Sequence, residues 1–161
     1  MPAVTKANVR KMLDDEEFQQ LNDIVDLPED KVVPILSNLM ANDSDPLIRQ
    51  RCAIALGMIG SPQAASALSE RLEDESKPVV ISAVRALGQL KDTSSVERVT
   101  GLLRSDDPSV RRYAAQALGV IAAPQSEQPL TDLLESEPED FVRESAAQSL
   151  RELHRRASDS N

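Results

Sequence analysis

Glycine recurs at an even interval in the middle of the chain, and this interval constrains the fold more than any other feature. Gly57, Gly88 and Gly119 are spaced 31 residues apart, and each lies near the end of a similar phrase. The three phrases are PLIRQRCAIALGMIG from Pro46, KPVVISAVRALGQLK from Lys77 and PSVRRYAAQALGVIA from Pro108. A fourth, less regular copy, DFVRESAAQSLRELH, begins at Asp140 after one extra residue. A repeat of this length predicts a solenoid in which each repeat packs on its neighbours.

Each phrase has the pattern of an α-helix. In the third copy, Asp107 can accept hydrogen bonds from the free N–H groups of a helix start, and Pro108 suits the first helical position. Apolar residues then recur at helical spacing and form one stripe: Val110, Ala114, Ala117, Leu118 and Ile121. The sequence therefore predicts a helix over residues 108–121.

A second helix is expected after each of the three regular phrases, following a short break. Its apolar positions are Ala65, Leu68 and Leu72; Val96, Val99, Leu102 and Leu103; and Leu130, Leu133 and Leu134. An earlier helix of the same kind, near residues 29–41, belongs to a divergent first repeat and has Val32, Val33, Ile35, Leu36, Leu39 and Met40. Each repeat is therefore predicted to be a helix, a turn and an antiparallel helix. We expect an all-α fold, a right-handed α-solenoid of about four to five helical pairs.

Small residues recur on the first helices, where close packing of helices requires them. One position holds Cys52, Ala83, Ala114 and Ala146, and another holds Ala55, Ala86, Ala117 and Ser149. A glycine inside a helix costs about 1 kcal/mol relative to alanine, so three recurring glycines indicate close helix crossings rather than accidents. The fourth copy has Arg151 at the glycine position, which fits a terminal repeat.

The ends of the chain depart from the repeat. Phe18, Leu21, Ile24 and Val25 predict one amphipathic helix, and residues 5–13 a short capping helix. The acidic run over residues 14–17 is interpreted as the first turn of a helix, where negative charge is favourable. We expect N-terminal capping helices over residues 1–30, the repeat array over 31–154, and a disordered polar tail over 155–161.

Charge and composition exclude several classes of function. The formal charge of −9 repels phosphate backbones and anionic lipids, so neither nucleic acid nor a membrane is an expected partner. The single cysteine cannot form an internal disulfide. Because no apolar run resembles a signal peptide or is long enough to cross a bilayer, we expect a cytoplasmic protein.

The sequence contains no recognisable catalytic constellation. His154, the sole histidine, is predicted to be a surface residue near a helix C-terminus, and Cys52 a small buried apolar side chain. No EF-hand, glycine-rich phosphate loop or histidine zinc motif is present, so no catalytic residue, cofactor or metal is expected. The best candidates for an anion contact lack interleaved aromatic residues for base stacking: Arg143, Arg151, Arg155 and Arg156.

The third copy also carries a known repeat motif. The motif reads Asp-Pro-x-Val-Arg and then Ala-Ala-x-Ala-Leu-Gly, carried by Asp107, Pro108, Val110, Arg111, Ala114, Ala115, Ala117, Leu118 and Gly119, with Pro129 and Leu130 in the second helix. Over roughly residues 31–153 the chain resembles the HEAT-like repeats of phycobilisome lyase-type proteins. Proteins with such repeats include interaction scaffolds, subunits of bilin-attaching lyases, chromophore-detaching factors and HEAT-like DNA glycosylases.

The resemblance gives a role to one arginine position. This position holds Arg49, Arg111 and Arg143, but Val80 in the second copy. In such repeats the arginine resembles a strut that pairs with acidic residues of an adjacent repeat. Exposed pairs of this kind would contribute less than about 1 kcal/mol each. Val80 interrupts the ladder of struts.

The resemblance also implies a binding face, because the second helices usually line the concave side of HEAT-type stacks. The predicted partner-binding residues are the outward residues of these helices: Glu70, Glu73, Glu97, Arg98, Arg104, Gln128, Asp132 and Glu135. Since this face is polar and mostly acidic, the predicted ligand is a basic or polar segment of another protein. A plain solvated face is the alternative interpretation.

Three functional hypotheses follow. The first is a non-enzymatic protein-interaction or assembly scaffold, because a repeat array builds an extended surface without a catalytic constellation. The second, which rests on the resemblance alone, is a subunit or accessory factor of a bilin lyase or phycobiliprotein-handling system. In that case the bilin is usually attached to a cysteine of the client protein. The third, a HEAT-like DNA-repair enzyme, is disfavoured by the acidic surface and the absence of tryptophan.

Overall fold

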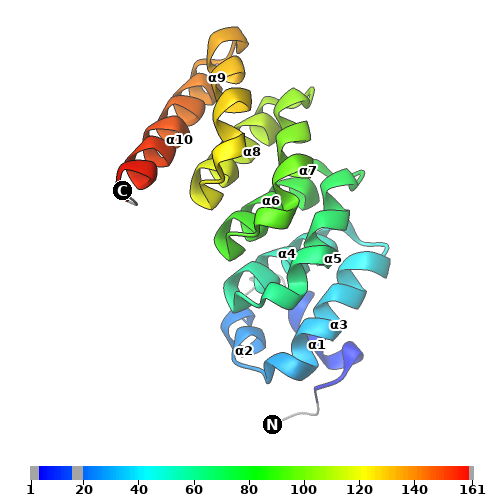
Figure 1. Ribbon diagram of the computed structural model, residues 1–161. Helices are drawn as coiled ribbons and strands as arrows, with labels where there is room; N and C mark the ends of the chain where they lie inside the picture. Colours follow the sequence, from blue (N-terminus) through cyan, green and yellow to red (C-terminus); the bar gives the residue numbers. More distant parts are fainter. Residues whose placement is uncertain (1–3, 16–19, 160–161) are drawn as a thin grey trace. The chain divides into compact units, whose positions relative to one another are not determined.

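The computed structural model describes residues 4–15 and 20–159, and the secondary structure assigned there consists of α-helices and short 3₁₀ helices (Figure 1). The chain divides into two compact units, Met1–Ala86 and Leu87–Asn161, which we call unit 1 and unit 2. Helix α6, Lys77–Leu90, contains the boundary.

Unit 1 begins with short helices and continues with the first regular repeat. Its elements are α1 (Lys6–Leu13), α2 (Leu21–Val25), α3 (Glu29–Asn42), α4 (Pro46–Ile59), η1 (Pro62–Ala64), α5 (Ala65–Glu70), η2 (Arg71–Glu73) and the first turns of α6. Helix α4 packs against α3, and α1 packs against both. The predicted capping helix over residues 5–13 is therefore present as α1, whereas Phe18 lies outside the described residues.

Unit 2 holds the end of α6 and the remaining repeats. Its further elements are η3 (Thr93–Ser95), α7 (Val96–Gly101), η4 (Leu102–Arg104), α8 (Pro108–Ile121), η5 (Pro124–Ser126), α9 (Glu127–Ser136) and α10 (Asp140–Asp159). Helix α10 packs against both α8 and α9. The fourth copy of the repeat is thus a single long helix.

Local sequence signals explain where the first helices begin and end. Asp45 and Asp107 accept hydrogen bonds from backbone N–H groups at the starts of α4 and α8, and each is followed by a proline at the first helical position. Helix α4 ends at Gly60, which has a positive φ of 75°. Helix α8 spans Pro108–Ile121, so the helix predicted over residues 108–121 is confirmed.

Two of the three recurring glycines, Gly88 and Gly119, lie at close helix crossings, as predicted. A Cβ added to Gly119 in α8 would lie 2.8 Å from the Cα of Ser149 in α10, a separation that real Cβ atoms essentially never show. At Gly88 the added atom would lie 3.2 Å from the Cα of Ala117. Ser149 also donates a hydrogen bond from its Oγ to the backbone oxygen of Ala115, so the α8–α10 crossing is both tight and polar.

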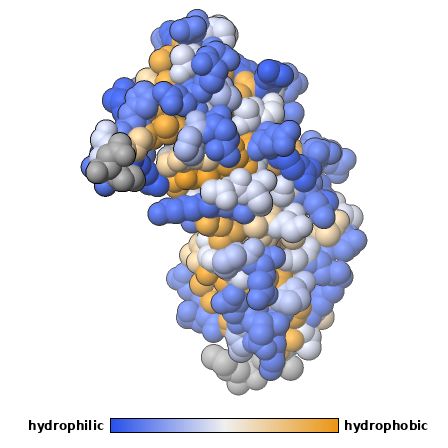
Figure 2. Space-filling model, viewed as in Figure 1, coloured by the Kyte–Doolittle hydropathy of each residue, from blue (hydrophilic) through white to orange (hydrophobic). Residues whose placement is uncertain are grey.

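The core consists of aliphatic and small side chains, as the composition requires. Its largest fully buried members are Leu13, Ile24, Leu36, Leu39, Met40, Ile48, Leu56, Leu68, Leu87, Leu118, Leu130 and Val9. Cys52 is fully buried, and this burial raises the pKa of its thiol well above the ordinary range. Figure 2 shows hydrophilic residues over most of the visible surface, with hydrophobic residues between them.

Two expectations about the ends of the chain are wrong. Residues 155–159 belong to helix α10 instead of a disordered tail, because Arg155 pairs with Glu152 and Asp159, and Arg156 donates a hydrogen bond to the carbonyl of Val120. The acidic run does not begin a helix at its first residue, since Asp14 caps the C-terminus of α1. The backbone N–H of Asp14 donates to the carbonyls of Arg10 and Lys11, whereas residues 16–19 lie outside the described part.

Candidate binding surface and the buried arginine pairs

The eight residues predicted to bind a partner are all exposed on second helices. In unit 1, Glu70 ends α5 and Glu73 ends η2. In unit 2, the exposed residues are Glu97 and Arg98 of α7, Arg104 of η4, and Gln128, Asp132 and Glu135 of α9. Because the apolar residues of the same helices are buried, packing directs these polar side chains to solvent. We call the eight residues the second-helix face.

Two of these residues line the same depression in unit 2. Arg104 and Asp132 line a shallow depression between α7–η4 and α9, together with Thr100, Leu103, Pro129, Leu133 and Ser136. Gln128 donates a hydrogen bond of 2.7 Å to the carboxylate of Asp132, one turn further along α9. The depression has a volume of about 180 Å³, whereas pockets for drug-sized ligands usually measure about 300–1,000 Å³. It can therefore hold a single side chain of a partner.

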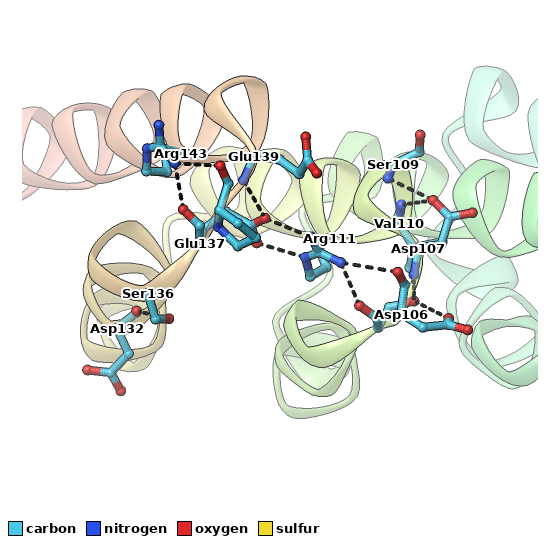
Figure 3. A network of polar contacts seen from close by, with 12 residues as sticks. Asp106, Asp107, Ser109, Val110, Arg111, Asp132, Ser136, Glu137, Glu139 and Arg143 are labelled. Carbon is cyan, nitrogen blue, oxygen red and sulfur yellow. Dashed lines mark hydrogen bonds and ion pairs between the residues drawn. The ribbon is translucent and has the colours of Figure 1, made fainter.

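In the same unit, the predicted arginine strut of α8 forms a buried network (Figure 3). Arg111 donates from Nε and Nη2 to the two carboxylate oxygens of Glu137, at 2.7 and 2.6 Å. Its Nη1 donates to the carbonyls of Ser105 and Asp106, in the loop that precedes α8. The Glu137 carboxylate also accepts the backbone N–H of Glu139. One guanidinium therefore fastens the loop before its own helix to the loop before the next first helix.

Unit 1 contains the same arrangement around Arg49 of α4. Arg49 donates to both carboxylate oxygens of Asp74, at 3.0 and 2.9 Å, and to the carbonyls of Asp43 and Ser44. The Asp74 carboxylate accepts the backbone N–H of Ser76. The predicted pairing of the arginine position with acidic residues of the next repeat is thus confirmed for Arg49 and Arg111.

These pairs are buried, so the small contribution expected of exposed pairs does not apply to them. The side chains of Asp74 and Glu137 are only 3% and 2% exposed. The hydrogen bond from Arg111 lowers the pKa of Glu137 against the opposing effect of burial. For Asp74, burial opposes ionisation, yet the bonds from Arg49 and the N–H of Ser76 hold the pKa below its ordinary value.

The sequence does contain a signal for these buried carboxylates, which is their recurrence at one loop position of the repeat. Neither the composition nor the repeat motif points to it. The same loop position of successive repeats holds Asp43, Asp74 and, two repeats after Asp74, Glu137. Each of these carboxylates accepts a hydrogen bond from the backbone N–H of the residue two positions later. Asp43 is paired too, because Arg10 of α1 donates to it at 2.7 Å. Asp43 therefore serves as both a turn residue and an ion-pair partner.

The remaining candidates for chemistry have ordinary structural roles. His154 is exposed, as predicted, with its Nε2 2.8 Å from a carboxylate oxygen of Glu127. Of the four basic residues considered for anion binding, Arg143, Arg155 and Arg156 are each paired with a carboxylate. Among residues 4–15 and 20–159, no three His, Cys, Asp or Glu side chains converge to hold a metal ion. Within those same residues, no helix is both long and apolar enough to cross a membrane.

Helical pairs that repeat along the sequence and pack through small residues define the chain as an all-α protein of the α-solenoid class. The profile of HEAT repeats matches residues 19–84 and 72–151, which together make up most of the sequence. The chain belongs to the HEAT repeat family. No match was found among curated protein sequences.

Solved structures of several kinds are similar to the chain. Human deoxyhypusine hydroxylase, in complex with glycerol, is 32% identical with a TM-score of 0.67, covering 76% of this chain and 43% of the hydroxylase. The chain thus spans less than half of that protein. The complex of CpcE and CpcF of phycocyanin lyase from Nostoc sp. PCC7120 gives 20% identity and a TM-score of 0.73, covering 96% of this chain and 67% of the matched one. A designed armadillo repeat protein in complex with the peptide (KR)4 is 19% identical with a TM-score of 0.62, covering 90% of this chain and 80% of the designed protein.

Proposed function

We propose that the protein is a non-enzymatic interaction module that binds a basic or polar segment of another protein through its second-helix face. The observation that carries this proposal is the exposure of charged side chains at corresponding places on three successive second helices. Repeat proteins use such faces to bind extended segments, because each repeat adds a similar set of contacts.

Charge favours a basic segment over an acidic one. Five of the eight residues on the face are carboxylates: Glu70, Glu73, Glu97, Asp132 and Glu135. Arg98 and Arg104 are its only basic members, and the chain as a whole carries a formal charge of −9. Opposite charge on a partner would speed its association and favour it over acidic competitors. The designed armadillo protein that holds a (KR)4 peptide has the same type of fold, which makes this ligand class a natural first probe.

Binding of a labelled (KR)4 peptide, followed by fluorescence anisotropy at low and high salt, tests the proposal directly. We expect binding that weakens as salt rises, because exposed ion pairs are screened. The triple variant Glu70→Lys, Asp132→Lys and Glu135→Lys should weaken it about tenfold, since three exposed pairs contribute roughly 0.5 kcal/mol each.

The control variant changes the total charge equally but leaves the second-helix face intact. It reverses three exposed carboxylates elsewhere: Asp30→Lys, Asp106→Lys and Glu144→Lys. Equal weakening by the two triple variants would show that only net charge matters, and would remove the second-helix face from the proposal. Absence of binding to the wild-type protein at low salt would remove the basic segment as the ligand class.

A second candidate is an accessory role in a phycobiliprotein-handling system. It is supported by the similarity of nearly the whole chain to one subunit in the CpcE–CpcF complex. The test is to mix the protein with bilin and an apo-phycobiliprotein, alone and with a second lyase subunit. Retention, transfer or release of bilin, seen in the absorption spectrum, would support this role, and an unchanged spectrum would contradict it.

A further inference from the structure

In unit 2, an arginine of α8 lies against two aromatic rings, one from its own helix and one from α10. The guanidinium carbon of Arg112 is 5.5 Å from the centre of the Tyr113 ring and 6.0 Å from the centre of the Phe141 ring. Both distances are within the range over which an aromatic face attracts a cation. We call these three residues the aromatic–arginine patch. Because α8 and α10 are first helices of the repeat, this patch is separate from the second-helix face.

The charge of Arg112 has no counter-ion in the described part of the chain. Among the described residues, its side chain forms no hydrogen bond and no ion pair, and its Nε is buried without an acceptor. Asp140, which precedes Phe141 in α10, pairs with Arg143 instead. Glu144, one helical turn later, makes no ion pair with Arg112. A buried donor without an acceptor costs free energy, and an acceptor supplied by a ligand would recover it.

Packing of the repeats does not account for the patch, because the repeat does not conserve its residues. At the position of Arg112 the other copies of the phrase hold unrelated residues: Gln50, Ile81 and Glu144. The same is true at the position of Phe141, where the other copies hold Leu47, Pro78 and Ser109. The side chain of Phe141 is also 39% exposed, so much of its apolar surface is not used by the fold.

We propose that the aromatic–arginine patch binds an acidic segment of another protein, with a carboxylate on Arg112 and a neighbouring apolar side chain on Phe141. A carboxylate matches the planar fork of a guanidinium, and contact with the rings leaves the guanidinium less freedom to lose on binding. Arginine and aromatic side chains are also the types that contribute most at protein interfaces. Nucleic acid fits less well, because a chain with a formal charge of −9 repels a polyanion at long range.

Binding of a labelled peptide of alternating glutamate and leucine, (EL)4, followed by fluorescence anisotropy, tests the proposal. We expect the wild-type protein to bind this peptide at low salt. Arg112→Gln should weaken binding about tenfold, because the charge-assisted hydrogen bonds to a carboxylate are lost. Phe141→Ser should weaken it about threefold, because less apolar surface is covered. Circular dichroism would confirm that each variant is folded, and Phe141→Ser alone suffices if Arg112→Gln does not fold.

The matched control is Arg151→Gln, which changes the net charge by the same amount as Arg112→Gln. Arg151 is exposed on α10, and its side chain makes no ion pair among the described residues. Its replacement should change binding of (EL)4 less than about twofold. Equal effects of the two substitutions, or no binding of (EL)4 by the wild-type protein at low salt, would overturn the proposal.

The patch and the second-helix face can be tested independently. Arg112→Gln should leave binding of (KR)4 unchanged, and the triple variant at Glu70, Asp132 and Glu135 should still bind (EL)4, so failure of one proposal is distinguishable from failure of the other. Sedimentation velocity of the protein alone tests whether a second copy fills the patch. We expect a monomer, and self-association that Arg112→Gln abolishes would overturn the assignment to another protein.

Discussion

The buried pair of unit 1, Arg49–Asp74, and that of unit 2, Arg111–Glu137, have the same bidentate geometry but different carboxylates. Asp74 lies 31 residues after the equivalent loop residue Asp43, whereas Glu137 lies 32 residues after its equivalent, Ser105. Unit 1 ends its second helix with the 3₁₀ turn η2, whereas α9 stays α-helical to Ser136. Because an α-helical turn holds more residues than a 3₁₀ turn, the extra residue is accommodated before the loop. The repeat thus tolerates a change in length and in side chain while the link persists.

Removal of one arginine should have the largest effect on this comparison. Arg49→Met and Arg111→Met each leave a carboxylate buried without its cation, and each should lower the free energy of unfolding by about 3 kcal/mol or more. Urea titration followed by circular dichroism measures the loss. Similar losses at the two sites would show that the aspartate and glutamate versions are energetically equivalent.

Arg143→Met is the matched control, because Arg143 occupies the same repeat position in α10. Its side chain is 38% exposed and pairs with Asp140, which is 92% exposed. Loss of an exposed pair costs less than about 1 kcal/mol. A loss at Arg143 as large as that at Arg111 would contradict the importance of burial.

Much of this architecture follows from local signals in the sequence. The helix over residues 108–121 is predictable because Asp107 and Pro108 mark its start and the apolar stripe fixes its length. The close crossings are predictable from the glycine positions. The burial of Asp74 and Glu137 is not, because it arises only when two loops close around one guanidinium. The helical end of α10 has a local signal in the spacing of Glu152 and Arg156, but its contact with Val120 depends on tertiary structure.

Nothing in the sequence alone tests whether the second-helix face binds a partner. The residues of that face are exposed for the same reason that any polar side chain on an amphipathic helix is exposed. Its eight members could be named in advance because the repeat spacing fixes which helical positions face outward. The partner could not be named, since the charges of the face define a class of ligand and not an identity.

Acid should distinguish the two pairs by the pH at which each begins to weaken. The pKa values of Glu137 and Asp74 are both lower in the folded chain than their ordinary values of 4.5 and 3.8. Each carboxylate therefore stabilises the fold fully above its ordinary pKa, and that stabilisation is lost as the pH falls toward the lower folded value. Stability measured by urea titration should fall first through Glu137 as the pH drops below 4.5, and Asp74 should follow below 3.8.

The double variant Arg111→Met with Glu137→Gln isolates the contribution of Glu137 to this acid sensitivity. Its stability should decline less between about pH 5 and pH 3 than that of the wild-type chain, because neither replacement side chain titrates in that range. An identical decline would assign the acid sensitivity to other carboxylates.

A change in carboxylate length should have a smaller effect. Glu137→Asp shortens the side chain by one methylene and weakens its bonds to Arg111, at an expected cost of about 1.5 kcal/mol. Asp74→Glu adds a methylene to a site that is 3% exposed, and overpacking there should cost about 1–3 kcal/mol. If neither swap changes the free energy of unfolding in urea titration, the link does not require aspartate in the shorter repeat and glutamate in the longer one.

Replacement of the entire pair should have the smallest effect of all. In Arg111→Met with Glu137→Gln, the volumes are nearly kept, and the side-chain amide oxygen introduced at position 137 can still accept the N–H of Glu139. No charge is left buried without a partner, so the double variant should lose about 1 kcal/mol or less, although Arg111→Met alone loses more. A double variant as unstable as the single one would mean that the links to the carbonyls of Ser105 and Asp106 carry the stability. In that case the main role of the Glu137 carboxylate would be to orient the guanidinium of Arg111 toward those carbonyls.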